Sequence, residues 1–363
     1  MRRPRWRRLW LKVHLYLGLT AGAVLMLLGL TGSILVFADD IDRTFNPQLA
    51  VASQQTSTTR SSLDEVFSSI ERQTGRPPYL IEIPSDPHAP YLAFASSQGA
   101  EPIALHVNPQ TAQVLASRQW GTFFVSFARR LHTELLLGDS GHWIVAIFGV
   151  LALVSTGTGL YLWWPRGGAW RRALTFHWHR YPAAINFELH RICGFYLCLV
   201  LLIVALSGVY LAAPEPFDAA LGSGSQTGKE TEGPGLASVQ AGASRIRLAS
   251  IAGILDRFAP GSTLTGVFIP ADPNAVMTVY YRDRREPRSE FGRSSLTLDQ
   301  YDGHILHVRS YNGMSVTDRV LSLQYLLHNG EIAGMPGRWL VFLCGLLPTL
   351  LFATGVYLWW VRR

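Results

Sequence analysis

The chain has 363 residues, enough for several domains; 48% of them are hydrophobic, only 16% are charged, and the formal net charge is +7 at pH 7. The positive net charge does not predict a nucleic-acid partner, because the arginines cluster beside long apolar runs, as they do in membrane proteins. The three cysteines, Cys193, Cys198 and Cys344, lie inside apolar runs and predict neither a disulfide framework nor a thiolate metal site.

Four apolar runs are long enough to cross the core of a lipid bilayer, which takes about 20 residues. They extend from His14 to Ala38, from His142 to Trp164, from Phe187 to Ala213 and from Arg338 to Trp360. The first run exceeds the roughly 7–15 apolar residues of a signal peptide, so we expect it to be an uncleaved anchor. The sequence therefore predicts four transmembrane helices.

Basic clusters set the expected orientation of these helices. The clusters are Arg2, Arg3, Arg5, Arg7 and Arg8, then Arg166, Arg171, Arg172 and Arg180, and finally Arg362 and Arg363. Because basic residues stay in the cytoplasm, the N-terminus, the loop 165–186 and the C-terminus are expected there. Residues 1–38 are thus predicted to form the cytoplasmic N-terminus and helix 1, and residues 338–363 to form helix 4 and the cytoplasmic tail. Helix 2 is predicted at 142–164 and helix 3 at 187–213. Residues 39–141 and 214–337 are expected outside.

Both external segments have the pattern of a small α+β domain. A helix is predicted from Leu63 to Gln73 and another near Leu248–Phe258, each followed by four short strand-like stretches. These stretches are Tyr79–Ile83, Tyr91–Ala95, Ile103–Val107 and Gln113–Arg118 in the first segment, and Thr265–Ile269, Val276–Tyr281, Ser295–Leu298 and His304–Arg309 in the second. Residues 221–244, rich in Gly, Ser, Gln and Thr, are expected to form a flexible linker.

The strongest signal in the sequence is an internal repeat. LHTELLLGDSGHWIVAIFGVLALVSTGTGLYLWWPR, from Leu131, and LHNGEIAGMPGRWLVFLCGLLPTLLFATGVYLWWVR, from Leu327, align without a gap and match at 15 of 36 positions. A weaker match joins helices 1 and 3, where His14, Gly18 and Gly32 correspond to His190, Gly194 and Gly208. Both copies read helix, external domain, helix, so the sequence predicts two parallel repeats related by a pseudo-two-fold axis along the membrane normal.

Four of the eleven histidines occupy paired positions in this repeat. His14 pairs with His190 at one end of the helices, and His132 pairs with His328 at the other. A two-fold axis would make each pair face itself, and haem is a ligand that takes two opposed imidazoles. Because no Cys-x-x-Cys-His occurs, such a haem would be b-type. The alternatives are polar anchors at the membrane interface and the proton-relay histidines of a transporter.

Other polar residues near the outer pair are candidates for haem contacts. His142 is either a substitute outer ligand or a propionate contact, although its repeat partner is Arg338, so it breaks the symmetry. Arg129, Arg130 and Arg338 are candidate partners of haem propionates, with ordinary interfacial charge as the alternative. His177 and His179 lie in the basic loop, where we expect them to be solvated.

Three segments resemble the PepSY-associated transmembrane proteins: HLYLGLTAGAVLMLLGLTGSILVF in helix 1, FELHRICGFY in helix 3 and the strand-turn-strand VNPQTAQVL. The resemblance covers essentially the whole chain. It implies an α-helical protein of the bacterial inner membrane, with four transmembrane helices in two parallel repeats and two periplasmic PepSY-like α+β domains. Members of this group include iron-regulated proteins and ferric-siderophore reductases that hold two b haems.

For this chain, the resemblance implies one haem on His14 and His190 and a second on His132 and His328, with His142 less certain. It also implies an enzyme that reduces a periplasmic ferric siderophore or other Fe(III) chelate. The chain ends without a flavin reductase domain, so we expect a separate electron donor, either a quinol or a cytoplasmic reductase. The alternative is a non-redox PepSY protein, acting as an accessory to a siderophore or iron permease or as a protease-regulating binding protein.

Overall fold

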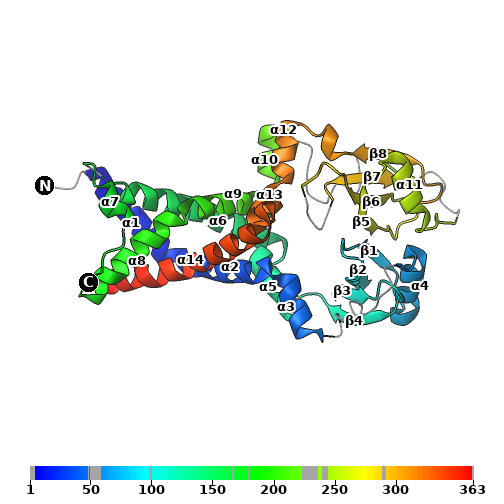
Figure 1. Ribbon diagram of the computed structural model, residues 1–363, viewed down its shortest axis with the longest axis horizontal. Helices are drawn as coiled ribbons and strands as arrows, with labels where there is room; N and C mark the ends of the chain where they lie inside the picture. Colours follow the sequence, from blue (N-terminus) through cyan, green and yellow to red (C-terminus); the bar gives the residue numbers. More distant parts are fainter. Residues whose placement is uncertain are drawn as a thin grey trace. The chain divides into compact units, whose positions relative to one another are not determined.

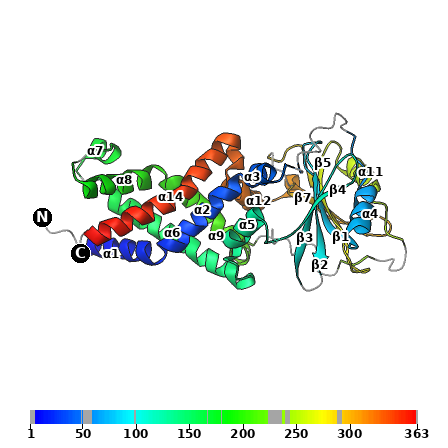
Figure 2. The same cartoon turned by 90° about the horizontal axis from the view of Figure 1, so that it is seen from below.

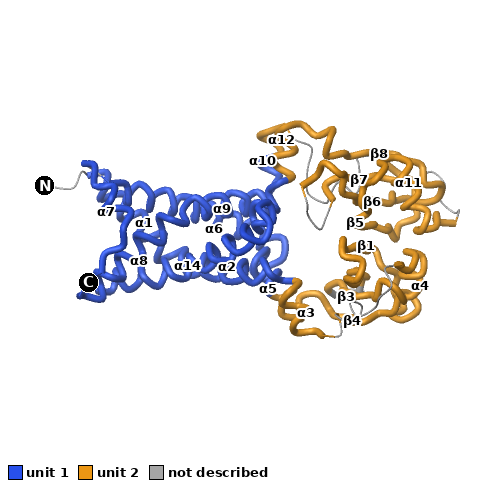
Figure 3. The backbone as a smooth tube through the Cα atoms, viewed as in Figure 1, with its two compact units in different colours: residues 1–38, 128–217, 323–363 blue, residues 39–127, 218–322 orange. Residues whose placement is uncertain are grey.

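The computed structural model describes residues 5–47, 49, 59–97, 100–165, 167–178, 180–222, 236–238, 244–287 and 292–361. Most of the predicted linker 221–244 lies outside these residues, as do Arg2, Arg3, Arg166, His179, Arg362 and Arg363. The chain separates into two compact units (Figure 3). Unit 1 comprises residues 1–38, 128–217 and 323–363, and unit 2 comprises residues 39–127 and 218–322. Unit 1 includes residues 128–141 and 323–337, which were predicted to belong to the external segments.

Unit 1 is a helical bundle. Among the described residues, two of its helices, α6 (Asp139–Trp163) and α14 (Gly334–Val361), are by themselves long and apolar enough to cross a membrane. Two further spans arise if each of two bent helix pairs counts as one. These pairs are α1 (Arg5–Thr20) with α2 (Gly22–Val36), bent by 60°, and α8 (Pro182–Tyr196) with α9 (Cys198–Ala212), bent by 61°.

The two bends occupy equivalent positions in the repeat. They fall at Ala21 and Leu197, which are 176 residues apart, as His14 and His190 are. On one side of the bends α1 packs on α6 and α8 packs on α14, whereas beyond them α2 packs on α14 and α9 packs on α6 (Figure 1). Each bent pair therefore touches its own half of the chain at one end and the other half at the other end.

Both units also contain short helices. They are α3 (Ala38–Phe45), α5 (Phe124–Glu134), α7 (Trp170–Leu174), α10 (Glu215–Leu221), α12 (Val316–Ser322) and α13 (Gln324–Asn329), with the 3-10 turns η3 (Tyr311–Gly313) and η4 (Glu331–Ala333). Figures 1 and 2 show that α1 and α8 begin, and α6 and α14 end, at the same end of unit 1. This arrangement agrees with parallel repeats.

Unit 2 is built on one antiparallel sheet of eight strands in the order β4-β3-β2-β1-β5-β6-β7-β8. The strands are β1 (Pro78–Glu82), β2 (Tyr91–Ser97), β3 (Ala100–Val107), β4 (Val114–Gln119), β5 (Thr263–Phe268), β6 (Met277–Arg282), β7 (Ser294–Leu298) and β8 (Ile305–Arg309). All eight lie where strands were predicted. The two halves meet at β1 and β5, where Ile81 is opposite Val267, so the α+β segments predicted as separate domains share a single sheet.

Two helices cover one face of this sheet, as Figure 2 shows for α4 (Leu63–Thr74) and α11 (Ser250–Phe258). α4 begins with a capping box between Ser62 and Glu65. The carboxylate of Asp64 accepts hydrogen bonds from the N–H groups of Leu248 and Ala249, at 2.8 and 2.9 Å, just before α11. The buried core between the helices and the sheet draws on both halves of the chain: Val66, Ile70, Ile81, Leu105, Ile251, Leu255, Val267 and Leu296.

Candidate functional site

The first histidine pair joins α1 and α8. The ring centres of His14 and His190 are 6.2 Å apart and their planes are nearly perpendicular, at 87°. Both side chains are half-buried inside unit 1. The repeat predicted that these two histidines correspond to each other, and the structure brings them together.

The second pair joins α5 and α13. The ring centres of His132 and His328 are 5.9 Å apart, with an interplanar angle of 52°. His132 hydrogen-bonds to α2, and the residue that accepts this bond, Leu28, is fourteen residues beyond His14 in the sequence. At 1.5 Å per helical residue this is a path of about 20 Å. The two pairs are thus separate sites that cannot share one metal ion.

In the first pair, hydrogen bonds orient the rings through Nδ1. Nδ1 of His14 lies 3.1 Å from the carbonyl oxygen of Ser155 and 3.0 Å from Oγ1 of Thr158. Nδ1 of His190 lies 2.8 Å from Oγ1 of Thr354, whose hydroxyl donates its own proton to a carbonyl one turn earlier in α14. Because these oxygens accept, Nδ1 carries the proton, and the lone pair of each neutral ring is on Nε2.

The second pair repeats this arrangement. Each Nδ1 donates to a backbone carbonyl at 2.9 Å and lies 3.2 Å from a hydroxyl oxygen. The partners are Leu28 and Thr31 for His132, and Val204 and Ser207 for His328. These partners are themselves separated by 176 residues, so the hydrogen bonds follow the repeat as the histidines do.

Glycines lie against the histidine rings. A Cβ atom at Gly32 would be 2.9 Å from Cε1 of His132, and a Cβ atom at Gly208 would be 2.9 Å from Cε1 of His328. Carbon atoms do not approach so closely, so any other residue at these positions displaces the ring. Gly159 stands in the same relation to His14, with a corresponding distance of 3.1 Å.

These features fit haem better than a bare metal ion. Among the described residues, no third His, Cys, Asp or Glu joins either pair, whereas a structural zinc site takes four protein ligands. An imidazole nitrogen binds a metal at about 2 Å, and the ring centre lies about 1 Å behind it, so two opposed imidazoles place their centres about 6 Å apart. Both pairs match this separation. The bonds at Nδ1 are the outer-shell contacts that ligating histidines normally make.

The other predicted contacts are placed differently. Arg338 donates to the carbonyl of Val36 at the end of α2, at 2.6 Å from Nη2, and its guanidinium lies 4.9 Å from the centre of the Phe37 ring. Arg130 pairs with Glu134 one turn later in α5, at 2.6 Å. Both arginines thus have protein partners. A role for either with a haem propionate stays a prediction.

His142 lies in the first turn of α6, half-buried, and among the described residues it makes no hydrogen bond and joins no cluster of ligands. His177 was expected to be solvated. Its Nδ1 lies 3.7 Å from the carboxylate of Glu188, which is paired with Arg191 at 2.6 Å. His179, which was also expected to be solvated, lies outside the described residues.

The residues that orient the histidines were not among the site residues predicted from the sequence. Their signal was present in the repeat: Thr158 and Gly159 are identical to Thr354 and Gly355 in the second copy. A hydroxyl retained in both copies of an apolar run needs a partner in the membrane.

Comparison with known proteins identifies the family. The family model of the PepSY-associated TM region matches residues 11–362, nearly the whole chain. No curated protein matches the sequence. The match agrees with the motifs in helices 1 and 3 and with the apolar helices of unit 1. The chain belongs to the family of membrane proteins defined by the PepSY-associated transmembrane region.

Proposed function

We propose that this protein is a dihaem reductase of the bacterial inner membrane, which passes electrons across the bilayer to a ferric siderophore or another Fe(III) chelate. The observation that supports this proposal is the presence of two histidine pairs, each with ring centres about 6 Å apart and each oriented through Nδ1. A structural role does not require the same hydrogen-bonding scheme at four repeat-related positions.

The protein's own residues have defined tasks in this proposal. Haem b, when bound, supplies an iron that takes up and releases one electron at a time. His14 and His190 would hold the inner haem, and His132 and His328 would hold the outer haem, each through Nε2. The Nδ1 hydrogen bonds keep every ring in the tautomer that leaves Nε2 free to ligate. Apolar helices around each pair exclude water.

The chain returns from unit 2 to unit 1 between Phe127 and Ala128 and again between Ser322 and Leu323. The outer pair lies close to these two points in the sequence, at His132 and His328. We place the reduction of the ferric chelate at the outer pair, on the side that the basic clusters predict to face the periplasm. Reduction weakens the chelate, because Fe(II) is a poorer partner than Fe(III) for hard oxygen ligands. Iron is thereby released or exchanged.

The visible spectrum of the purified protein tests this function. We expect a sharp α-band after dithionite reduction and about two haems per chain. His14→Ala or His190→Ala should remove about half of the haem, and His132→Ala or His328→Ala the other half. The inner variants should still reduce an external ferric chelate after chemical reduction, because their outer haem is intact, whereas the outer variants should not.

His142→Ala is the matched control and should retain full haem content, since His142 joins neither pair. Loss of haem in His142→Ala together with full content in His132→Ala would move the outer site to His142. A wild-type protein without haem, or full haem content in all four single variants, would contradict the proposal and favour the non-redox alternative.

A further inference from the structure

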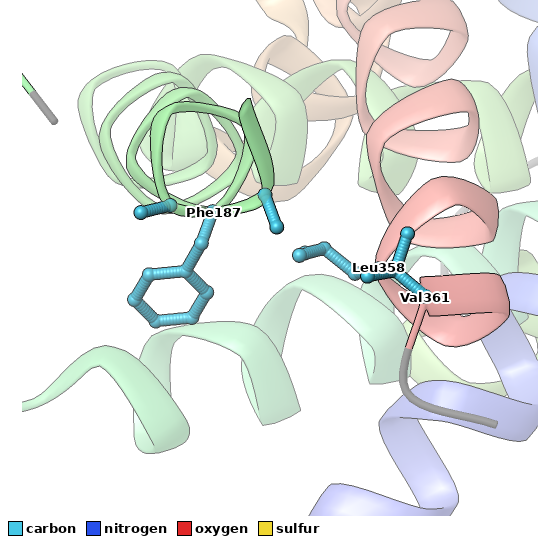
Figure 4. A pocket seen from close by; sticks show the side chains of 5 residues that line it. Phe187, Leu358 and Val361 are labelled. Atoms are coloured by element: carbon cyan, nitrogen blue, oxygen red, sulfur yellow. The ribbon is translucent and has the colours of Figure 1, made fainter. Parts of the chain in front are cut away.

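Large apolar side chains are exposed in both units, but for different reasons. In unit 1 they are expected, because its long helices are apolar enough to face lipid. Figure 4 shows two of them, Phe187 on α8 and Val361 at the end of α14. Unit 2 has a sheet and a buried core of its own, so large apolar side chains exposed there need a separate explanation.

In unit 2 these side chains gather on four short helices. Among the described residues of unit 2, the exposed large apolar side chains are Phe45, Phe124, Phe127, Leu221, Phe258, Val308, Val316 and Val320. Phe258 on α11 and Val308 on β8 belong to the sheet and the helices that cover it. The others lie on α3, α5, α10 and α12, and we call them the junction residues. Each of these helices contains or adjoins a point at which the chain passes between the two units.

The junction residues follow the internal repeat. Phe45 corresponds to Leu221 at the 176-residue spacing, and Phe124 corresponds to Val320 at the 196-residue spacing of the other alignment. All four are at least half exposed, at 72% and 53% in the first pair and at 54% and 51% in the second. A large apolar side chain exposed at the same place in both copies indicates a role that the copies share.

The same residues lie close in sequence to the membrane-spanning helices. α2 ends at Val36 and α9 ends at Ala212, so Phe45 and Leu221 each lie nine residues beyond the end of such a helix. At about 1.5 Å per helical residue this is a path of about 14 Å. The headgroup region on one side of a bilayer is about 5–8 Å thick, so a short helix that turns along the surface stays within reach of lipid.

Each copy presents its junction residues as an apolar stripe. In the first copy the ring centres of Phe45 on α3 and Phe124 on α5 are 6.1 Å apart, and Phe127 follows Phe124 by three residues on the same side of the helix. In the second copy Val316 and Val320 are four residues apart on α12, so they share a side as well. Val316 is 79% exposed.

The repetition of the stripe distinguishes a bilayer from a protein partner. Under the predicted two-fold axis along the membrane normal, the two stripes lie on opposite sides of the axis, so a single protein partner would cover only one of them. A bilayer surrounds the axis on every side. α3 and α12 also carry charges of both signs, including Asp40 and Arg43 on α3 and Asp318 and Arg319 on α12, so anionic lipid is not required.

We infer that the junction residues insert into the lipid interface at the membrane surface nearest the outer histidine pair. The four short helices lie along this surface and anchor unit 2 to the bilayer at all four of its connections to unit 1. Because α5 carries both Phe124 and His132, the lipid contact also fixes the helix that supplies one outer histidine. The inference requires that unit 1 spans a membrane, and it does not require haem.

Fluorescence quenching in the full-length protein, held in nanodiscs of neutral phosphatidylcholine, tests the inference. Val316→Cys and Leu221→Cys are labelled with an NBD dye, and labelled wild type gives the background from the native cysteines. A nitroxide on the upper acyl chain of the lipid should reduce the emission of both labels about twofold, whereas iodide in the water should have little effect. Val308→Cys is the matched control, because it changes an exposed valine of unit 2 outside the junction residues, and it should respond to iodide alone.

Phe45→Cys and Phe258→Cys form a second matched pair, in which the first should respond to the nitroxide and the second to iodide. Junction labels that respond only to iodide overturn the inference and leave the haem proposal standing. Labels shielded from both quenchers reveal a protein partner or a second copy, and quenching by the nitroxide in one copy alone contradicts the shared role; either result also overturns it. Nitroxide quenching in both copies of a protein without haem supports the inference while contradicting the reductase.

Discussion

At the scale of single residues, the histidines depend on small and hydroxylated neighbours. A ligating imidazole must keep its Nε2 lone pair and its orientation, and both follow from the acceptor at Nδ1. At His328 the acceptors are the carbonyl of Val204 and the hydroxyl of Ser207, and Gly208 leaves room for the ring. Three residues within about one turn of α9 thus position one histidine of another helix.

Gly208→Ala should disturb the outer pair alone. The new Cβ would lie 2.9 Å from Cε1 of His328, so the ring must move, and we expect the haem-to-protein ratio to fall from about two toward one. Gly157→Ala is the control, because a Cβ at Gly157 meets no atom within 4 Å. That control should keep full haem content and gain up to about 1 kcal/mol of helix stability. Full haem content in Gly208→Ala would show that the ring does not depend on this glycine.

At the scale of secondary-structure elements, an ion pair in unit 2 connects α3 with the sheet. The carboxylate of Asp42 on α3 accepts two hydrogen bonds from Arg118 on β4, at 2.7 and 2.5 Å. The guanidinium of Arg118 also lies 3.9 Å from the centre of the Phe123 ring. His106 of β3 is only 12% exposed beside this pair, with Nε2 3.3 Å from Arg118.

This arrangement predicts a loss of stability in mild acid. Burial, together with the positive charge of Arg118, lowers the pKa of His106 from 6.5 to about 4, with Asp42 opposing the shift. Between these values the unfolded chain binds a proton that the folded chain does not, so stability is full above pH 6.5 and falls as the pH approaches 4. The difference amounts to about 3 kcal/mol.

Thermal unfolding of the full-length protein at pH 7 and pH 4.5 measures this effect. His106→Gln should unfold with a smaller dependence on pH than wild type, because it removes the group that titrates. The exposed His304 offers the control, and His304→Gln should keep the wild-type dependence. An unchanged dependence in His106→Gln would place the acid sensitivity elsewhere.

At the scale of the whole molecule, the basic residues predict how unit 1 is oriented in the membrane. Among the described residues, α1 carries Arg5, Arg7, Arg8 and Lys12 near its beginning. Arg171 and Arg172 lie in α7. Reporter fusions after Arg172 should therefore be active only in the cytoplasm, and fusions after Asp42 and Glu215 only outside. Outside activity after Arg172 would reverse the orientation.

The same fusions test the bent helix pairs. If α1 with α2 is one span, Arg5 and Asp42 lie on opposite sides of the membrane. If the pair is instead a re-entrant loop, fusions after Asp42 will be active in the cytoplasm. Because the bends of 60° and 61° match, we expect α8 with α9 to cross the membrane in the same way as α1 with α2. Fusions after Glu215 should therefore be active on the same side as fusions after Asp42.

The sequence by itself determined the elements and their repetition. Long apolar runs predicted the helices of unit 1, and alternating short stretches between turns predicted all eight strands of unit 2, because both patterns follow from local burial. The repeat also identified His14, His132, His190 and His328 as two pairs. Comparing two copies within one chain supplied the information that periodicity alone lacks.

The tertiary structure decided which surfaces meet. The bends at Ala21 and Leu197 follow from packing against two partners in turn, which no local pattern reports. The pairing of β1 with β5 depends on two strand edges far apart in the sequence, so two predicted domains became one sheet. The acceptors at each Nδ1 likewise exist only once separate helices are packed together.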